Sequence, residues 1–246
     1  MRKFGLIGYP LTHSFSEKYF SEKFEKEEIA DCNYSLFPLE NIQDVRFLFE
    51  VEKDLHGLNV TIPFKETVIE YLDDLDETAQ KIGAVNCIKI DEIQKVGYNT
   101  DYSAFRDSLK PLLKQQHKKA LILGTGGASK AVNYALQELN VQPVFVSRNK
   151  SENNFTYTEL NGDIISEFPV IINCTPTGMY PDTNVAPEIP YHLLSKNNLL
   201  FDLIYNPEKS LFLQQGEKQG CSIKNGLEML QLQAEYAWKI WNTDQE

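Results

Sequence analysis

The feature that most constrains the fold of this chain is a short apolar run that passes through closely spaced glycines into a helix-forming stretch. The apolar run is Ala120–Leu123, and the glycines are Gly124, Gly126 and Gly127. Helix-favouring residues follow from Ala128. A strand that turns on glycines into a helix is the first unit of a doubly wound parallel sheet. The helix N-terminus offers free N–H groups and a positive dipole end to a phosphate. We therefore predict that a nicotinamide dinucleotide binds at this turn.

The turn alone leaves its ligand open, because a tight turn without a ligand looks the same and a methyltransferase uses a similar one. The next expected strand ends at Ser147 and runs on into Arg148 and Lys150, with no carboxylate among these positions. Enzymes that use NAD usually place an acidic residue there to accept a hydrogen bond from the ribose 2′-hydroxyl. Two cations in its place favour NADP over NAD and over S-adenosylmethionine. The alternative is a solvated basic loop.

Apolar patterning predicts that strands and helices alternate along the whole chain, which indicates an α/β protein. In the first hundred residues we expect strands at Phe4–Gly8, Cys32–Leu36, Leu58–Ile62, Ala84–Ile90 and Val96–Tyr98, and helices from the Ser14 cap to Glu28 and at Ile42–Glu52, Thr67–Leu72 and Glu77–Ile82. Beyond them we expect strands at Ala120–Leu123, Pro143–Ser147, Val170–Cys174 and Leu199–Leu203, and helices at Asp101–Leu113, Ala128–Leu139 and Ser210–Gly220. The amphipathic stretch Gly226–Trp241 has no strand after it, so we expect it to pack on one of two domains.

Composition excludes several classes of function. The net charge is −11, and no basic stripe offsets it, so nucleic acid is not an expected partner. The four cysteines and four histidines are scattered without metal-ligand spacing, so we expect neither a metal site nor a disulfide. No apolar run approaches the length of a membrane span, and no signal peptide is visible. We therefore expect a cytoplasmic protein without membrane partners, present as a monomer or a homodimer.

Three further segments place polar side chains at or just past the ends of expected strands, where open α/β sheets bind ligands. They are Gly8–Ser16, Gly57–Lys65 and Gly83–Asn86, the last followed by Asn99–Asp101. On these strings the chain strongly resembles the shikimate dehydrogenase family. The resemblance continues in order through Gly124–Ser129, Asn173–Met179, Asp202, Tyr205–Pro207, Asn225–Gly226, Met229–Leu230 and Gln233–Ala234, and so covers nearly the whole chain.

The resemblance implies reversible, NADPH-dependent reduction of 3-dehydroshikimate to shikimate, a step toward chorismate and the aromatic amino acids. It implies a substrate domain at residues 1–101, completed by the C-terminal helix 225–246, and a Rossmann-type NADP domain at residues 102–224. Hydride delivery to a ketone leaves an alkoxide that must be stabilised and protonated, and an ammonium group can do both. In the family these parts fall to a Lys and an Asp that correspond to Lys65 and Asp101.

The binding roles that the resemblance implies divide into two sets. For the substrate, we expect contacts from Ser14, Ser16, Asn59, Thr61, Asn86, Tyr205 and Gln233. For the cofactor, we expect contacts from Gly124, Gly126, Gly127, Ala128, Ser147, Arg148, Lys150, Thr175, Met179 and Gly226. Met179 and Tyr205 are expected to border both the nicotinamide and the substrate. Apart from the resemblance, turn geometry alone would explain Asn59 and Asn86.

Some positions depart from the family pattern. Glu17 stands where the family commonly has proline, and Tyr102 where it has glycine. The cofactor loop has Ser147–Asn149 in place of Asn-Arg-Thr, and the stretch after it is short. Two alternatives therefore stay open beside the NADP-linked shikimate enzyme. One is a relative that prefers quinate or NAD, and the other is a non-catalytic regulator that binds shikimate-like ligands.

Overall fold

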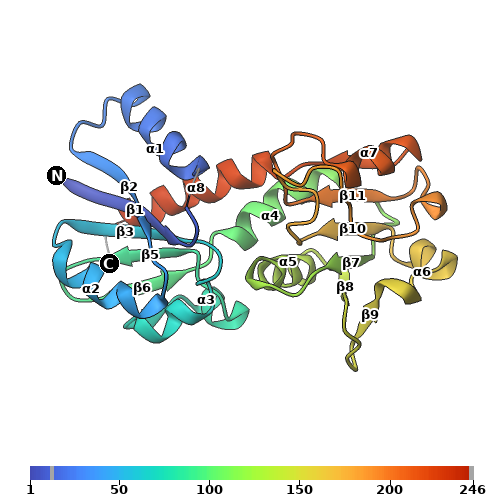
Figure 1. Cartoon of the computed structure of the whole chain (residues 1–246), viewed down its shortest axis with the longest axis horizontal. Helices are drawn as coiled ribbons and strands as arrows, with labels where there is room; N and C mark the ends of the chain where they lie inside the picture. Colours follow the sequence, from blue (N-terminus) through green and yellow to red (C-terminus); the bar gives the residue numbers. More distant parts are fainter. Residues whose placement is uncertain (12–13, 244–246) are drawn as a thin grey trace. The chain divides into compact units, whose positions relative to one another are not determined.

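The computed structural model describes residues 1–11 and 14–243, and the chain divides into two compact units (Figure 1). Unit 1 comprises residues 1–100 together with 234–246, and unit 2 comprises residues 101–233. The sequence analysis placed the first border between the domains one residue later, after residue 101. It placed the second border between residues 224 and 225, before the C-terminal helix, whereas the units divide after residue 233. The segment 234–246 belongs to unit 1 although it follows unit 2 in the sequence. No helix within the described ranges is long and apolar enough to cross a bilayer.

Unit 1 is built on a six-stranded mixed sheet in the order β2-β1-β3-β5-β6-β4. The strands are β1 (Arg2–Gly8), β2 (Cys32–Pro38), β3 (Leu55–Val60), β4 (Asp74–Leu75), β5 (Cys87–Ile90) and β6 (Lys95–Tyr98). Strands β1, β2 and β3 are mutually parallel, whereas β5 runs antiparallel to both β3 and β6. The carboxyl ends of β1, β3 and β6 and the amino end of β5 therefore meet at one edge of the sheet.

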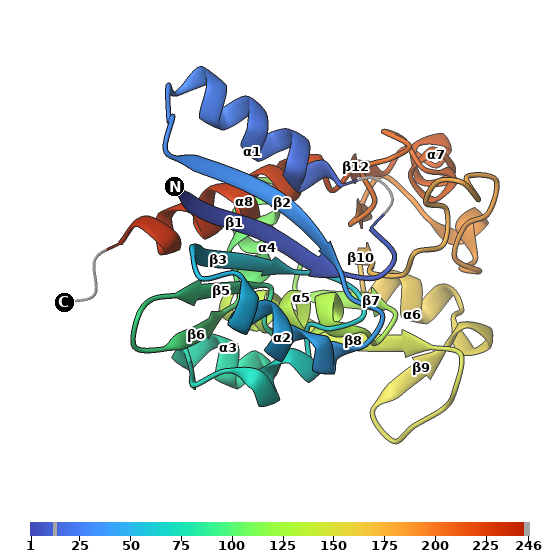
Figure 2. The same ribbon diagram turned by 60° about the vertical axis from the view of Figure 1, so that its left-hand side comes forward.

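Helices cover both faces of this sheet (Figure 2). They are α1 (Phe15–Lys26), α2 (Val45–Val51), α3 (Glu77–Ile82) and the 3₁₀ turns η1 (Ile42–Asp44) and η2 (Thr67–Tyr71). Side chains alternate along β1, so that Phe4 packs with Phe20 of α1 on one face while Ile7 packs with Leu48 of α2 on the other. The period-two pattern of β1 thus fixes which helix covers which face.

The C-terminal helix α8 (Leu227–Asn242) belongs to both units, because its first residues lie in unit 2 and the rest in unit 1. Trp241 anchors it, stacking on Phe4 with ring centroids 4.8 Å apart and donating its indole N–H to the carbonyl of Ile88 at 2.9 Å. A Cβ at Gly57 would lie 2.2 Å from the Trp241 indole nitrogen, so glycine is required there. This packing explains the helix that no strand follows in the sequence.

Unit 2 contains an all-parallel sheet in the order β12-β11-β10-β7-β8-β9. The strands are β7 (Lys119–Leu123), β8 (Gln142–Ser147), β9 (Asn154–Thr156), β10 (Val170–Asn173), β11 (Leu199–Asp202) and β12 (Ser222–Lys224). Numbered within the unit, their order is 3-2-1-4-5-6, the doubly wound arrangement predicted from the sequence. The order reverses between β7 and β10, and such a switch point is where these sheets bind dinucleotides.

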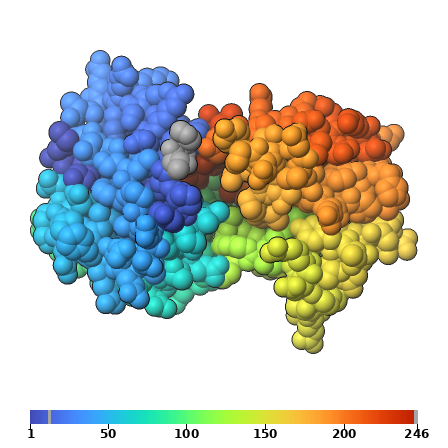
Figure 3. All heavy atoms as spheres, in the orientation of Figure 1, coloured from blue at the N-terminus to red at the C-terminus, as the bar shows by residue number. Residues whose placement is uncertain are grey.

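The helices of unit 2 are α4 (Asp101–Leu109), α5 (Gly127–Glu138), α6 (Gly162–Glu167) and α7 (Leu211–Lys218), with the 3₁₀ turns η3 (Lys110–Leu112), η4 (Tyr157–Glu159) and η5 (Tyr191–Leu193). Helices α6 and α7 pack on a core of fully buried strand residues such as Leu121, Ile171 and Leu200, whereas Phe105 of α4 packs on Phe201 of β11. The turn between β8 and β9 projects from the body of this unit, in yellow in Figure 3. It carries the predicted cofactor loop.

The predicted fold class is confirmed, and the differences lie in short elements. The helix expected over Asp101–Leu113 ends at Leu109 and continues as η3, because Pro111 lacks the N–H that an α-helix needs. The sequence pattern did not reveal β4, β9, α6 or β12. Each has two to six residues, too few for a period of its own to stand out.

Candidate functional site

The predicted substrate residues of unit 1 gather at the sheet edge where β1, β3 and β6 end and β5 begins. Thr61 directly follows β3, and its N–H donates to the carbonyl of Ile7 at 2.9 Å. A Cβ at Gly8 would lie 2.4 Å from the Thr61 methyl, so the end of β1 and the loop after β3 are in close contact. Because β5 runs antiparallel to both β3 and β6, Asn86, which directly precedes β5, lies at the same edge.

The amides of Asn59 and Asn86 form a buried hydrogen-bond network at this edge. Asn59 accepts from the Tyr34 hydroxyl at 2.8 Å and donates to the Asn86 carbonyl at 3.3 Å. Asn86 accepts from the Thr100 N–H at 2.6 Å and donates to the Thr100 hydroxyl at 2.9 Å. These four side chains are all buried. Both asparagines therefore hold the ends of the strands together, whatever else they bind.

The start of α1 supplies the two predicted serines. Ser14 is the N-cap of the helix, and its hydroxyl accepts from the Glu17 N–H at 3.4 Å. Ser16 is buried and hydrogen-bonds to Tyr34, which links the helix to the asparagine network. Burial raises the pKa of Tyr34 well above its ordinary value, and the Ser16 hydrogen bond opposes that shift. Tyr34 is a member of this edge that sequence reasoning missed.

Lys65 lies in the loop after β3, and its backbone is fixed on both sides. The preceding Phe64 is buried in the core of unit 1, and the Lys65 carbonyl accepts from the Val85 N–H at 2.7 Å. The side chain of Lys65 is partly buried. Asp101, the predicted partner, is buried at the first position of α4 in unit 2. Each residue is therefore anchored in its own unit, and the pairing of the two stays a prediction.

The glycine turn of unit 2 has the geometry that an anion site needs. Gly124 has a φ of +99°, and a Cβ there would lie 2.9 Å from the Thr175 methyl, so only glycine fits. Gly126 is the N-cap of α5 and opens onto space, since a Cβ there would meet nothing within 4 Å. Gly127 and Ala128 are the first residues of α5. Backbone N–H groups thus face a space that a pyrophosphate can enter.

A buried polar network joins the loops after β10 and β11, next to the glycine turn. Asp202 accepts from Asn173 at 3.0 Å, from the Ile204 N–H at 3.0 Å and from the Ser210 hydroxyl. Asn173 in turn accepts from the hydroxyl of Thr175 at 2.6 Å. Burial raises the pKa of Asp202 to about 6, against the hydrogen bonds that favour its charged form. This network fixes the loop that carries Thr175, and no local sequence pattern predicted it.

The remaining predicted residues of unit 2 fall in three places. Met179 follows that loop and is 45% exposed. Tyr205 is partly buried after β11, and burial raises the pKa of its hydroxyl. Gly226 packs against Leu203, the residue after β11, because a Cβ at Gly226 would lie 2.1 Å from the Leu203 carbonyl oxygen. Gln233 is buried on α8 and donates to the Leu230 carbonyl at 2.9 Å.

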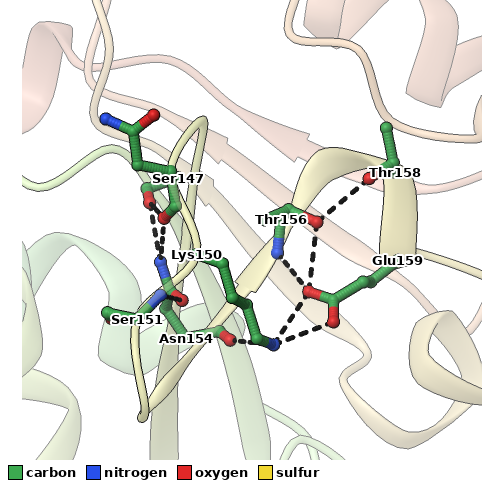
Figure 4. Close-up of polar contacts among 8 residues, drawn as sticks. Ser147, Lys150, Ser151, Asn154, Thr156, Thr158 and Glu159 are labelled. Carbon is green, nitrogen blue, oxygen red and sulfur yellow. Dashed lines mark hydrogen bonds and ion pairs between the residues drawn. The ribbon is translucent and has the colours of Figure 1, made fainter.

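The cofactor loop after β8 is folded by its own contacts (Figure 4). Asn154 accepts from the Ser151 N–H at 2.7 Å and donates to the Ser147 hydroxyl at 2.6 Å and to the Asn149 carbonyl at 2.9 Å. Lys150 forms an ion pair with Glu159, its ammonium lying 2.8 and 2.9 Å from the two carboxylate oxygens. Ser147 and Lys150, both expected to meet the cofactor, therefore already have partners within the loop.

Arg148 differs from its neighbours in this loop. It is exposed, and within the described ranges no hydrogen bond or ion pair engages its guanidinium. Its charge lies near Tyr157, where it lowers the pKa of the phenol against the larger, opposite effect of burial. A free guanidinium at the end of the second strand is suited to a phosphate on the adenosine ribose.

The four cysteines, all of them described, are free thiols. Burial raises the pKa of Cys174 well above its usual range and that of Cys221 to about 11, so neither thiol is activated. Across residues 1–11 and 14–243, no three His, Cys, Asp or Glu side chains are grouped as metal ligands.

Comparison with known proteins places this geometry in a family. Residues 6–88 match the family model described as the shikimate dehydrogenase substrate binding domain. The NADP-dependent shikimate dehydrogenase of Methanococcus maripaludis is 38% identical over 96% of this chain and 90% of its own. The crystal structure of shikimate dehydrogenase 1 from Peptoclostridium difficile has a TM-score of 0.87 at 36% identity, covering 100% of this chain and 94% of that one. The Thermus thermophilus enzyme, solved with NADP(H) and shikimate, has a TM-score of 0.87 at 28% identity over 98% and 94%. The chain therefore belongs to the shikimate dehydrogenase family.

Proposed function

We propose that this protein is an NADP-dependent shikimate dehydrogenase, which reversibly reduces 3-dehydroshikimate to shikimate on the way to chorismate and the aromatic amino acids. The observation that carries the proposal is the convergence of polar side chains at one edge of the unit 1 sheet, in a chain whose relatives bear this name. A cytoplasmic monomer or homodimer without nucleic-acid or membrane partners is part of the same proposal, and the acidic surface supports it.

Lys65 and Asp101 are the catalytic residues of this proposal. NADPH, when bound, supplies the hydride that reduces the carbonyl carbon of the substrate. The Lys65 ammonium stabilises the negative charge that develops on the carbonyl oxygen and donates the proton that makes it a hydroxyl. In the reverse direction, the Lys65 amine accepts that proton. The Asp101 carboxylate holds the ammonium in place and favours its charged form.

The polar edge of unit 1 recognises the substrate in this proposal. Ser14 and Ser16 bind the substrate carboxylate. The side chains that meet the carboxylate or the ring hydroxyl groups are Asn59, Thr61, Asn86 and Gln233, and Tyr205 borders the substrate. Since Asn59 and Asn86 are already locked into a buried network, they present fixed partners to the ligand. A rigid site of this kind rejects analogues that lack a hydroxyl, because its own polar groups would be left unpaired.

The edge of unit 2 binds the cofactor in this proposal. The first turn of α5, with Gly124, Gly126, Gly127 and Ala128, holds the pyrophosphate. Arg148 binds the 2′-phosphate, with Ser147 and Lys150 in the same loop. Thr175, Met179 and Gly226 line the nicotinamide side. Three observations support this fit: the open space at Gly126, the unengaged guanidinium of Arg148 among the described residues, and the lack of a carboxylate at the end of β8.

A spectrophotometric assay at 340 nm tests the proposal. Shikimate and quinate are each offered to the purified protein with NADP and with NAD. We expect reduced nucleotide to form fastest from shikimate and NADP. Faster turnover of quinate or of NAD would identify the quinate- or NAD-preferring relative. Shikimate binding without turnover of any pair would identify the non-catalytic regulator and overturn the proposal.

A further inference from the structure

The ion pair between Lys150 and Glu159 bears directly on how the cofactor loop recognises a phosphate. Both oxygens of the Glu159 carboxylate contact the Lys150 ammonium, and the Asn154 carbonyl accepts from the same ammonium at 2.9 Å. Contact with the Lys150 ammonium holds the pKa of Glu159 at about 2, so the negative charge of Glu159 is present at any physiological pH. Of the two cations in the loop, Lys150 is thus neutralised within the protein.

The Glu159 carboxylate is fixed in position independently of Lys150. It accepts from the Thr156 N–H at 2.7 Å and from the Thr156 hydroxyl at 3.1 Å, in a capping box at the start of η4. Glutamine also serves in a capping box, because its amide oxygen accepts the same backbone N–H. Glu159→Gln therefore removes the charge and keeps the cap.

The loop does not depend on this ion pair for its shape. Asn154 is 9% exposed, and its side chain binds Ser147, Asn149 and Ser151, which close the turn by themselves (Figure 4). The side chains of Lys150 and Glu159 are 53% and 40% exposed, so water screens their attraction and the pair is easily exchanged. Releasing Lys150 thus frees a cation without unfolding the turn that carries Arg148.

We propose that Glu159 weakens the binding of the cofactor's 2′-phosphate by holding Lys150 in an ion pair. This inference rests on the proposed function only in taking that loop as the adenosine side of the site. The Lys150 ammonium can bind the 2′-phosphate only when its ion pair with Glu159 is broken. Glu159 is then a specificity-determining residue that narrows the difference in affinity between NADP and NAD.

The test measures the binding of adenosine 2′,5′-bisphosphate and of 5′-AMP by calorimetry, since these probes differ only in the 2′-phosphate. We expect Glu159→Gln to tighten the bisphosphate by roughly threefold to tenfold and to leave 5′-AMP unchanged. Lys150→Gln alone should change bisphosphate binding by less than about twofold, because its ammonium is already neutralised. In the double variant, the gain from Glu159→Gln should disappear.

Glu167→Gln is the matched control, since it removes the same charge and releases Lys119 at the opposite edge of the sheet. This control should change neither the affinity for adenosine 2′,5′-bisphosphate nor the affinity for 5′-AMP. If it matches the gain of Glu159→Gln, net charge alone explains the effect and the inference fails. The inference also fails if Lys150→Gln weakens the bisphosphate as strongly as Arg148→Gln does, or if Glu159→Gln weakens both probes. Neither probe requires turnover, so a protein inactive on shikimate would leave this outcome intact.

Discussion

The sheet edge of unit 1 and the sheet edge of unit 2 that hold the predicted site residues differ in the groups they present. The edge of unit 1 consists of buried side chains that bind one another, as with Asn59, Asn86 and Thr100. The edge of unit 2 offers backbone N–H groups at the start of α5 and an exposed, unpaired guanidinium within the described chain, Arg148. Substitutions at the first edge should therefore disturb folding and binding together. Substitution of Arg148 at the second should change affinity while the fold remains intact.

The largest effect is expected from removing the proposed proton donor of unit 1, Lys65. Lys65→Met should lower kcat by roughly 10²–10⁴ with a smaller change in KM, because the ammonium acts mainly on the charge that develops in the transition state. Steady-state kinetics with shikimate and NADP measure this effect. Lys18→Met, on the exposed side of α1, is the control. A kcat near that of the unaltered protein would exclude Lys65 from the chemistry.

The next effect concerns the buried carboxyl of the second unit. The pKa of Asp202 is about 6 in the folded protein against an ordinary value of 3.8, so the folded state binds this proton more tightly than the unfolded chain. Stability from this group is present below about pH 4 and falls as the pH rises to about 6. The full change is about 3 kcal/mol.

The Asp202→Asn variant should lack this contribution to the pH dependence of the unfolding free energy. Between pH 4 and pH 7, the difference in unfolding free energy between the two proteins should shift by about 3 kcal/mol in favour of the variant. Urea denaturation at several pH values measures the shift. A constant difference across that range would show that Asp202 does not titrate there.

A smaller loss of stability is expected at the asparagine network of the first edge. Asn86→Ala removes the two buried hydrogen bonds that Asn86 makes with the N–H and the hydroxyl of Thr100, which costs about 1–3 kcal/mol. The unfolding midpoint in urea should fall accordingly, and shikimate binding should weaken in parallel. A variant that loses binding at unchanged stability would mean that the network does not support the fold.

The smallest effect separates the two edges most directly. Arg148→Gln should weaken NADP binding by roughly tenfold to thirtyfold, because a charge-assisted contact with the phosphate is lost. NAD binding and thermal stability should stay unchanged, since the guanidinium has no partner among the described residues. Equal weakening of both nucleotides would show that this loop does not read the phosphate.

The sequence predicted those parts of the site whose structural elements all lie within one short segment of the chain. The glycine turn needs only a strand, three glycines and a helix start, all within Ala120–Ala128. The Lys150–Glu159 pair and the Asp202–Ser210 contact were missed because each joins side chains eight or nine positions apart across a turn. Nothing in local periodicity signals such a pairing. The short strand β9 escaped notice for the same reason, since its neighbour β8 stabilises it.

The shared helix α8 has a consequence for the order in which the chain can fold during synthesis. Phe4 of the first strand stacks on Trp241, which is synthesised after the whole of unit 2. As the ribosome makes the protein, unit 2 has its whole sequence available before unit 1 does. The part of the unit 1 sheet that Trp241 covers therefore stays exposed until α8 has been synthesised. During that interval, this apolar surface is open to chaperones and to aggregation, so a chain truncated before Trp241 should be a better chaperone client than a folded protein.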